Sequence, residues 1–168
     1  MSLLALLHIA CLALLAVLLI GAGAQDWRSM HIANAFPLAI AGLFVVWAVV
    51  ELSSGRLSPT GLGLAFGCAV VVFAIGAAAF AVGGLGGGDV KLLAAVSLFA
   101  GPPRLLDFLA VTAIVGGVLG LAILAGAPIG RPAMAAGGSL RTRLRGGLPY
   151  GPAIAAGGLW LVASLGLG

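Results

Sequence analysis

Charged residues are scarce in this chain. Only 7% of its 168 residues are Asp, Glu, Lys or Arg, whereas 62% are hydrophobic, and the mean hydropathy is +1.28. A soluble domain carries about 25% charged residues, so the composition excludes an ordinary soluble domain. The 28 glycines and eight prolines fit a membrane protein, since both residues are more frequent in membrane helices than in soluble ones. We therefore expect a single polytopic membrane domain over residues 1–168.

Cysteine is also scarce. Cys11 and Cys68 both lie in apolar runs and form no CxxC pair. Neither a zinc site nor a disulfide framework is indicated, so we predict no metal and no cofactor, and we interpret both cysteines as small packing residues. The net charge of +4 does not indicate a nucleic-acid partner, because no basic stripe is interleaved with aromatic residues. Membrane lipid is the expected surrounding partner.

Long apolar stretches make up most of the sequence and predict an all-α membrane protein with six transmembrane helices in one bundle. Pro59 suits the first turn of the third helix. The fourth helix is short, because about 13 residues at 1.5 Å each cover roughly 20 Å, against a hydrocarbon core of about 30 Å. Gly101-Pro102-Pro103 ends it. The predicted spans are residues 3–24, 35–52, 60–82, 89–101, 105–127 and 149–167.

The first span resembles a signal peptide in one respect, since Ala22-Gly23-Ala24 has the small residues of a cleavage site. Two features argue against cleavage. No Lys or Arg precedes the span, and its apolar run is longer than the core of a usual signal peptide. We therefore expect the span to be retained as a transmembrane helix.

The basic residues predict the topology. With six spans, the first, third and fifth loops lie on one side of the membrane and carry six Lys or Arg residues, whereas the second and fourth loops carry only Arg56 and Arg104. Because cytoplasmic loops are enriched in Lys and Arg, we predict that the odd loops face the cytoplasm and that both termini face outward. The six basic residues of the odd loops are Arg28, Lys91, Arg131, Arg141, Arg143 and Arg145.

A glycine-rich stretch at residues 83–91 interrupts the apolar sequence. Five glycines fall in the six residues before Asp89, and Lys91 follows two residues later. Glycine lets another chain approach closely, and an ionisable residue at membrane depth predicts a functional site. Because the fourth helix is short, we expect Asp89 to lie recessed below the cytoplasmic surface of the membrane, in a notch that water can reach.

Asp26 lies in the predicted first loop, residues 25–34, on the same side as Asp89. Two carboxyl groups brought close together cannot both ionise. The ionised one can take a proton from water while its neighbour protonates a substrate carbonyl, which is the chemistry of an aspartic protease. The structural alternative is helix capping, because Asp89 stands where an N-cap would. We interpret Glu51 and Asp107, near the outward loops, as interfacial charges with access to solvent.

Three motifs occur in the order seen in a known family. Asp26 is followed by Ile32-x-Asn34, then by Gly86-x-Gly88-Asp89-x-Lys91, then by Pro149-Tyr150-Gly151-Pro152. In these motifs, which extend from the first predicted span to the sixth, the chain resembles the type IV prepilin peptidase family, whose GxGD motif is shared with the archaeal preflagellin peptidases and the presenilins. The resemblance implies an intramembrane aspartic endopeptidase of the bacterial cytoplasmic (inner) membrane, with Asp26 and Asp89 as its catalytic pair at the cytoplasmic face. The implied substrates are prepilins or pseudopilins, which lose a short basic leader cut just outside their hydrophobic segment.

The chain departs from the family pattern in two places. Ala33 stands where a proline usually precedes the asparagine of the first motif, and we expect this to affect the entry of the second span more than the chemistry. Larger members also carry an N-terminal cytoplasmic domain with paired cysteines, linked to methylation of the new N-terminus, for which there is no room before Asp26. The chain therefore resembles the minimal branch associated with Flp-type, or tight-adherence, pili, and we predict peptidase activity without N-methyltransferase activity.

The residues around the two aspartates each have two interpretations. Gly86 to Gly88 either present bare backbone to an extended substrate or form a flexible turn. Lys91 either stabilises the charged form of Asp89 or marks the cytoplasmic interface, which we favour. The motif that starts the last span either shapes the substrate groove or is a tight helix entry. We expect His31 to be an interfacial polar residue, and we expect Arg141, Arg143 and Arg145 to fix the topology. The residues that we assign to substrate binding or loop shaping are Gly86, Gly87, Gly88, Lys91, Asn34, Pro149, Gly151 and Pro152.

Two other classes of protein share some of these features. A small membrane transporter also has buried aspartates and broken helices, although here the short helix and the glycine loop occur once rather than in matching halves. A non-catalytic pilus-assembly scaffold would retain the fold alone. Substitution of Asp26 or Asp89 by Asn separates the three classes, because a peptidase loses cleavage, a carrier loses transport and a scaffold loses neither.

Overall fold

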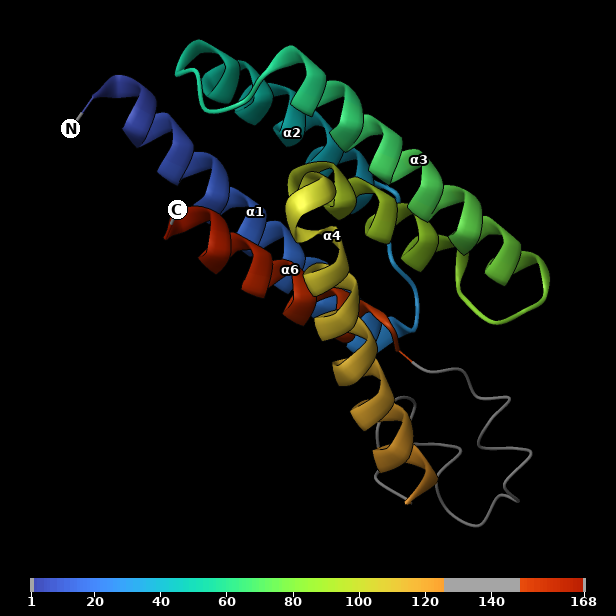
Figure 1. Cartoon of the computed structure of the whole chain (residues 1–168). Coiled ribbons are helices and arrows are strands. Elements are labelled where there is room, and N and C mark those ends of the chain that lie inside the picture. The colour runs from blue at the N-terminus through green and yellow to red at the C-terminus, as the bar shows by residue number, and fades with distance from the viewer. Residues whose placement is uncertain (1, 126–148, 168) are drawn as a thin grey trace.

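The computed structural model describes residues 2–125 and 149–167, and within these ranges the chain forms five α-helices and no strand (Figure 1). This confirms the all-α expectation. The first four helices are each long and apolar enough to cross a membrane, and the last is a shorter apolar helix. The helices are α1 (Leu3–Ser29), α2 (Ala35–Ser53), α3 (Pro59–Ala81), α4 (Gly87–Leu124) and α6 (Gly151–Gly166).

The predicted fourth and fifth spans are the two parts of α4, which bends sharply at Gly101 (Figure 1). Gly101 has φ 53° and ψ −174°, a conformation that L side chains rarely adopt. Pro102 and Pro103 follow it and cannot donate main-chain hydrogen bonds to the preceding turn. The expected break at residues 101–103 is therefore present as a kink at which two helical segments meet, and the crossing of the membrane six times remains a prediction.

The first loop is shorter than predicted, because α1 continues through Ser29 and Gln25 to Ser29 are helical. No glycine or proline follows Ala24 to stop the helix, and the Ser29 hydroxyl bonds back to the Gln25 carbonyl at 2.8 Å. Met30 ends the helix in the left-handed conformation, with φ 53°, while its N–H donates to the Asp26 carbonyl at 2.8 Å. Asp26 thus lies in the last turn of a helix rather than in a loop.

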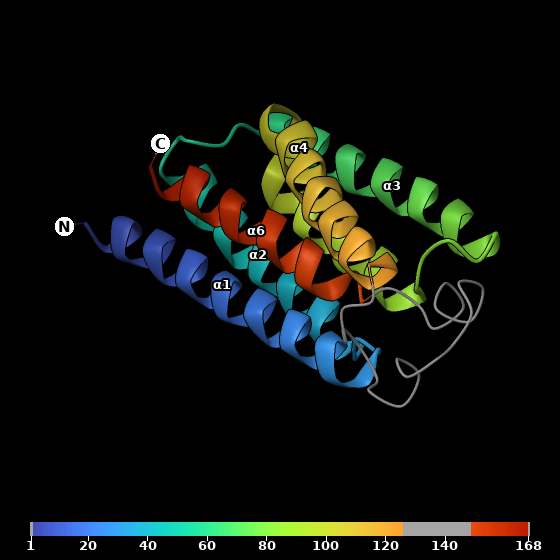
Figure 2. The same cartoon turned by 90° about the horizontal axis from the view of Figure 1, so that it is seen from below.

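The part of α4 that precedes the bend lies at the centre of the molecule. The helix packs against α2, α3 and α6, while α1 packs against α2 and α6. Figures 1 and 2 show α1 lying along α6 in the opposite direction, so that both chain termini are at one end of the bundle. The end of α1 and the start of α6 meet at the other end.

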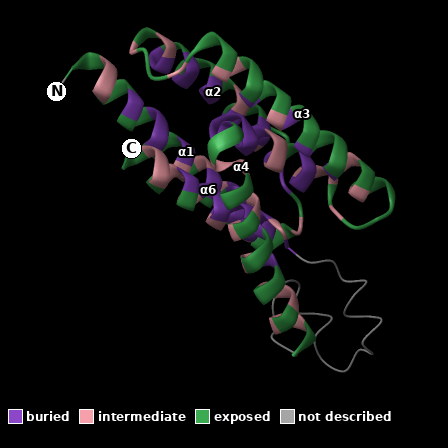
Figure 3. Ribbon diagram, viewed as in Figure 1, coloured by how far each residue is buried: buried purple, intermediate pink, exposed green. Residues whose placement is uncertain are grey.

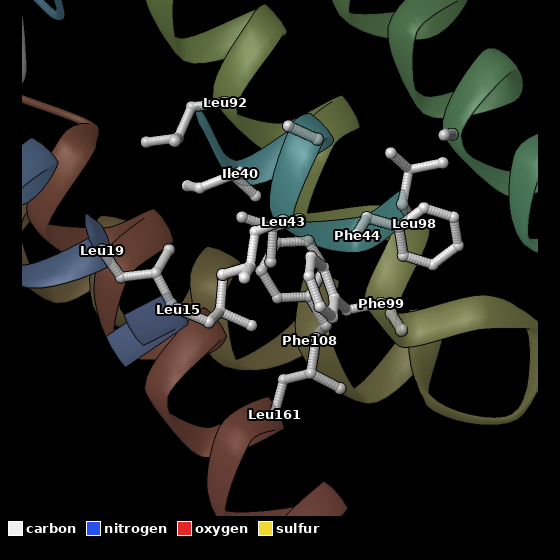
Figure 4. Close-up of a cluster of buried hydrophobic side chains, with 14 of the residues drawn as sticks. Leu15, Leu19, Ile40, Leu43, Phe44, Leu92, Leu98, Phe99, Phe108 and Leu161 are labelled. Carbon is white, nitrogen blue, oxygen red and sulfur yellow. The ribbon is translucent and has the colours of Figure 1, made fainter. Parts of the chain in front are cut away.

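Apolar side chains fill the centre and also cover much of the outside. Leu15, Ile40 and Leu92 are fully buried, and the Phe44 and Phe99 rings are 5.3 Å apart between centroids (Figure 4). Exposed residues follow the outer sides of α1 and α3 and the distal part of α4 (Figure 3), and many of them are large and hydrophobic. An apolar outer surface of this extent fits a protein that faces lipid.

A polar cluster lies at the end of the bundle where the termini are. The Glu51 Oε1 atom accepts hydrogen bonds from His8 Nδ1 at 2.8 Å and from Arg56 at 3.1 Å. Because Glu51 is only 5% exposed, the interpretation of this residue as a solvent-accessible interfacial charge was wrong. Asp107, by contrast, is exposed as expected.

Some of the predicted features lie outside the described residues. These are the loop arginines 131, 141, 143 and 145 and the last two residues of the predicted fifth span.

Candidate active site

Asp26 is held in place by the start of the last helix. It lies on the buried side of the final turn of α1 and is 5% exposed. Its Oδ2 atom accepts a hydrogen bond of 2.8 Å from the main-chain N–H of Gly151, at the first residue of α6. This bond joins two of the three sequence motifs, although 125 residues separate the partners in the chain.

Asp89 lies in the first turn of α4 and is 8% exposed. The capping alternative predicted Asp89 as the N-cap of this helix, but the N-cap is Gly86. Asp89 is instead the third helical residue, and its Oδ2 atom accepts from the Gly86 N–H at 3.2 Å. Within the described part of the chain, the buried Oδ1 atom makes no hydrogen bond. The helix cap therefore uses one carboxyl oxygen of Asp89 and leaves the other available for a further partner.

The first motif lies against both of the helices that carry the two aspartates. The loop between α1 and α2 fits between the elements that carry them. A Cβ atom added to Gly88 would lie 3.0 Å from the Cβ of Ile32 and 3.2 Å from its carbonyl oxygen. Gly88 therefore lets the first motif pack directly against the start of α4.

The third motif packs against α1 at close range. A Cβ atom added to Gly151 would lie 2.5 Å from the Cβ of Asp26 and 2.9 Å from its Oδ2 atom. One turn earlier in α1, a Cβ on Gly23 would lie 3.4 Å from the Cα of Pro152. Pro149 is fully buried, and Tyr150 is the N-cap of α6. The last helix thus begins at Gly151, two residues later than predicted, with its first main-chain N–H directed at Asp26.

Lys91 and Asn34 form a separate polar contact beside the two aspartates. The Nζ atom of Lys91 donates to Asn34 Oδ1 at 2.9 Å, and both residues are exposed. This bond connects the start of α2 with the first turns of α4. The structure therefore directs Lys91 to Asn34, which agrees with a position at the surface of this end of the bundle. Gly86 is exposed and Gly87 is half-buried, and His31 is exposed.

Gln25 was not predicted to shape the site. Its Oε1 atom accepts from the main-chain N–H of Ala33 at 3.0 Å, and this contact fixes the first motif to the last turn of α1. A glutamine beside Asp26, in a polar stretch that follows a long apolar run, was the available signal in the sequence. In residues 2–125 and 149–167, no group of three His, Cys, Asp or Glu side chains is placed to hold a metal ion.

Two buried carboxyl groups near each other can share the work of acid and base toward one water molecule. A model of the type IV leader peptidase family matches residues 13–121, well over half of the chain. The matched part includes Asp26, Asn34 and Asp89 but not the motif at 149–152. No curated protein matches the chain. No solved structure matches it either.

Proposed function

Because the chain belongs to the type IV leader peptidase family, whose members are aspartic prepilin peptidases, we propose that Asp26 and Asp89 are its catalytic pair. One observation carries the proposal. The packing of α1, α4 and α6 gathers these two buried carboxyl groups at one end of the bundle, where the third motif binds Asp26 through the Gly151 N–H at 2.8 Å.

The two carboxyl groups have different surroundings, which suggests different roles. The short bond from Gly151 favours the ionised form of Asp26, because a hydrogen bond to a carboxylate is stronger than one to a neutral acid. Asp89 accepts a longer bond of 3.2 Å and has a free oxygen within the described residues. We assign Asp26 as the general base and Asp89 as the general acid at the start of the reaction.

The reaction then proceeds in two balanced steps. Asp26 takes a proton from water as the water oxygen bonds to the scissile carbonyl carbon, and Asp89 gives its proton to the carbonyl oxygen. The resulting diol breaks its C–N bond when Asp26 returns its proton to the leaving nitrogen and Asp89 takes one from a diol hydroxyl. The products are a leader with a new carboxyl group and a mature chain with a new amine, and both aspartates are restored to their starting states.

The substrate class and the location follow from the family and the sequence. We propose that the substrates are prepilins or pseudopilins of Flp-type pili and that the chain crosses the bacterial inner membrane six times. The excess of Lys and Arg in the odd loops supports a position of the aspartates at the cytoplasmic face. We further propose that the product is not methylated by this chain, which lacks a paired-cysteine motif among its two cysteines.

The test is cleavage of the prepilins encoded in the same organism by the full chain in liposomes, followed by mass spectrometry of both products. Wild-type chain is compared with Asp26→Asn, Asp89→Asn and the control Asp107→Asn, which removes an exposed carboxylate outside the site. We expect leader removal by the wild type and the control, none by the other two, and a mature product without an added methyl group. Cleavage that survives either substitution in the site would remove that residue from the mechanism.

A further inference from the structure

A hollow of about 560 Å³ lies between α2, α3 and α4, and we call it the α2–α3–α4 groove. Its lining is apolar apart from Asn34 and Lys91. Several of the lining side chains are exposed, among them Leu38 at 70% and Val70 at 66%, so the groove is open on the outer side of the bundle. All three helices contribute to the lining, among others through Leu38 and Ala41 of α2, Phe66 and Val70 of α3, and Ala94 and Leu98 of α4.

The groove begins at the end of the bundle that carries the two aspartates, although neither aspartate lines it. Lys91 is two residues beyond Asp89 on α4, and its bond to Asn34 lies at the edge of the groove. From Lys91, the lining runs along α4 to Leu98. Seven residues at 1.5 Å each make about 10 Å, or two helical turns. The groove therefore starts near the site and leads away from it, along the apolar part of the bundle.

We propose that the α2–α3–α4 groove binds the hydrophobic segment of the substrate as a helix, and so sets which peptide bond reaches the aspartates. This inference rests on the proposed function. A helix docks into a groove through side chains at positions i, i+3 or i+4, and i+7, and that spacing spans the same two turns as the lining of α4. Cleavage just outside a hydrophobic segment follows, because the anchored helix ends where the groove meets the site.

The chemistry of the groove favours a polypeptide occupant. Its apolar walls suit a segment that is already in the membrane and enters from the side. At the edge nearest Asp89, the Asn34 amide can accept from a main-chain N–H, and the Lys91 ammonium can donate to a main-chain carbonyl. These polar groups are placed where the substrate chain leaves its helix and exposes unpaired main-chain groups.

Filling the groove tests this role. Ala41→Phe adds a ring to the lining, whereas Ala39→Phe adds the same ring to an exposed position of α2 outside the lining. We expect Ala41→Phe to lower kcat/KM for a prepilin at least tenfold, mainly through KM, and Ala39→Phe to stay within twofold of wild type. Equal losses in the two variants, or none in either, would overturn the proposal.

A binding measurement covers the case in which Ala41→Phe does not fold. A photo-crosslinking residue is placed either at Val70 in the groove or, as a control, at Leu121 on the distal part of α4. The two positions are similarly exposed, Val70 at 66% and Leu121 at 67%. Both chains also carry Asp89→Asn, so that added prepilin is not consumed. We expect the prepilin to cross-link through its hydrophobic segment at Val70 at least fivefold more than at Leu121. Equal yields, or cross-linking at Val70 only to lipid or to a second copy of the chain, would overturn the proposal.

The two proposals fail in different ways. If the wild type cleaves the prepilin but Val70 does not cross-link to it, the groove proposal fails and the peptidase proposal stands. If the wild type cleaves no prepilin, the peptidase proposal fails. Cross-linking of the prepilin at Val70 would then still support the groove as a binding site for its hydrophobic segment, and the lack of cross-linking would overturn both.

Discussion

Gly151→Ala is the substitution that most directly disturbs the position of Asp26. The added Cβ would lie 2.5 Å from the Cβ of Asp26, and ordinary van der Waals contacts begin at 3.4 Å. One of the two elements must therefore move by about 0.9 Å. The atoms in contact belong to the first turn of α6 and to a short side chain on α1, so neither is the far end of a flexible side chain.

The expected effect on catalysis is large for so small a change. The displacement also weakens the 2.8 Å hydrogen bond from the Gly151 N–H to Asp26 Oδ2. A misplacement of about 1 Å in an active site can cost about 100-fold in rate, which corresponds to roughly 2.7 kcal/mol of transition-state stabilisation. We therefore expect kcat/KM for prepilin cleavage to fall about 100-fold, with the helical fold retained.

The assay compares Gly151→Ala with Gly117→Ala in the same liposomes, with thermal unfolding as a check on the fold. Gly117 is a matched control, because within the described residues nothing lies within 4 Å of a Cβ added there. We expect the control to cleave at the wild-type rate. A folded Gly151→Ala chain that also cleaves at the wild-type rate would refute the claim that the start of α6 positions Asp26.

Three further predictions concern the frame around the site. Glu51→Ala removes the buried acceptor of two hydrogen bonds at the far end of the bundle and should destabilise the chain by about 2 kcal/mol, seen as a lower Tm, whereas the exposed Asp107→Ala should leave Tm unchanged. Gly101→Ala forces an alanine into φ 53° and should destabilise the bend by about 1–3 kcal/mol, again measured by Tm; an unchanged Tm would mean that the bend can relax. Lys91→Met and Asn34→Ala should show coupled effects on stability of about 1 kcal/mol in a double-mutant cycle, and simple additivity would argue against their 2.9 Å bond.

The sequence predicted the elements better than their ends. The long apolar runs predicted the helices, and Pro59 correctly marked the start of α3. The end of α1 was misplaced because polar residues after Ala24 were interpreted as a loop, although the helix stops only at Met30. Charge alone does not end a helix whose main-chain hydrogen bonds continue, and the left-handed conformation of a methionine has no clear signal in the sequence.

The same limit applies to the site. The motifs predict Asp26 and Asp89 as the catalytic pair, but the spacing of motifs cannot show which group binds Asp26. The Gly151 N–H takes that place because α6 packs against α1 in the opposite direction, an arrangement set by tertiary packing. Glu51 was misinterpreted for a related reason, since its partner His8 lies 43 residues away on another helix and no local pattern pairs them.

The central claim is that Asp26 and Asp89 act as one unit on a single water molecule. The most direct test measures kcat/KM for prepilin cleavage in Asp26→Asn, Asp89→Asn and the double variant, each checked for correct folding. Residues that act as a unit are not additive, and the loss of acid–base catalysis costs roughly 10²–10⁴-fold or more. We predict that each single substitution costs as much as the double one. Losses that multiply in the double variant, or a single variant that retains wild-type activity, would contradict the account.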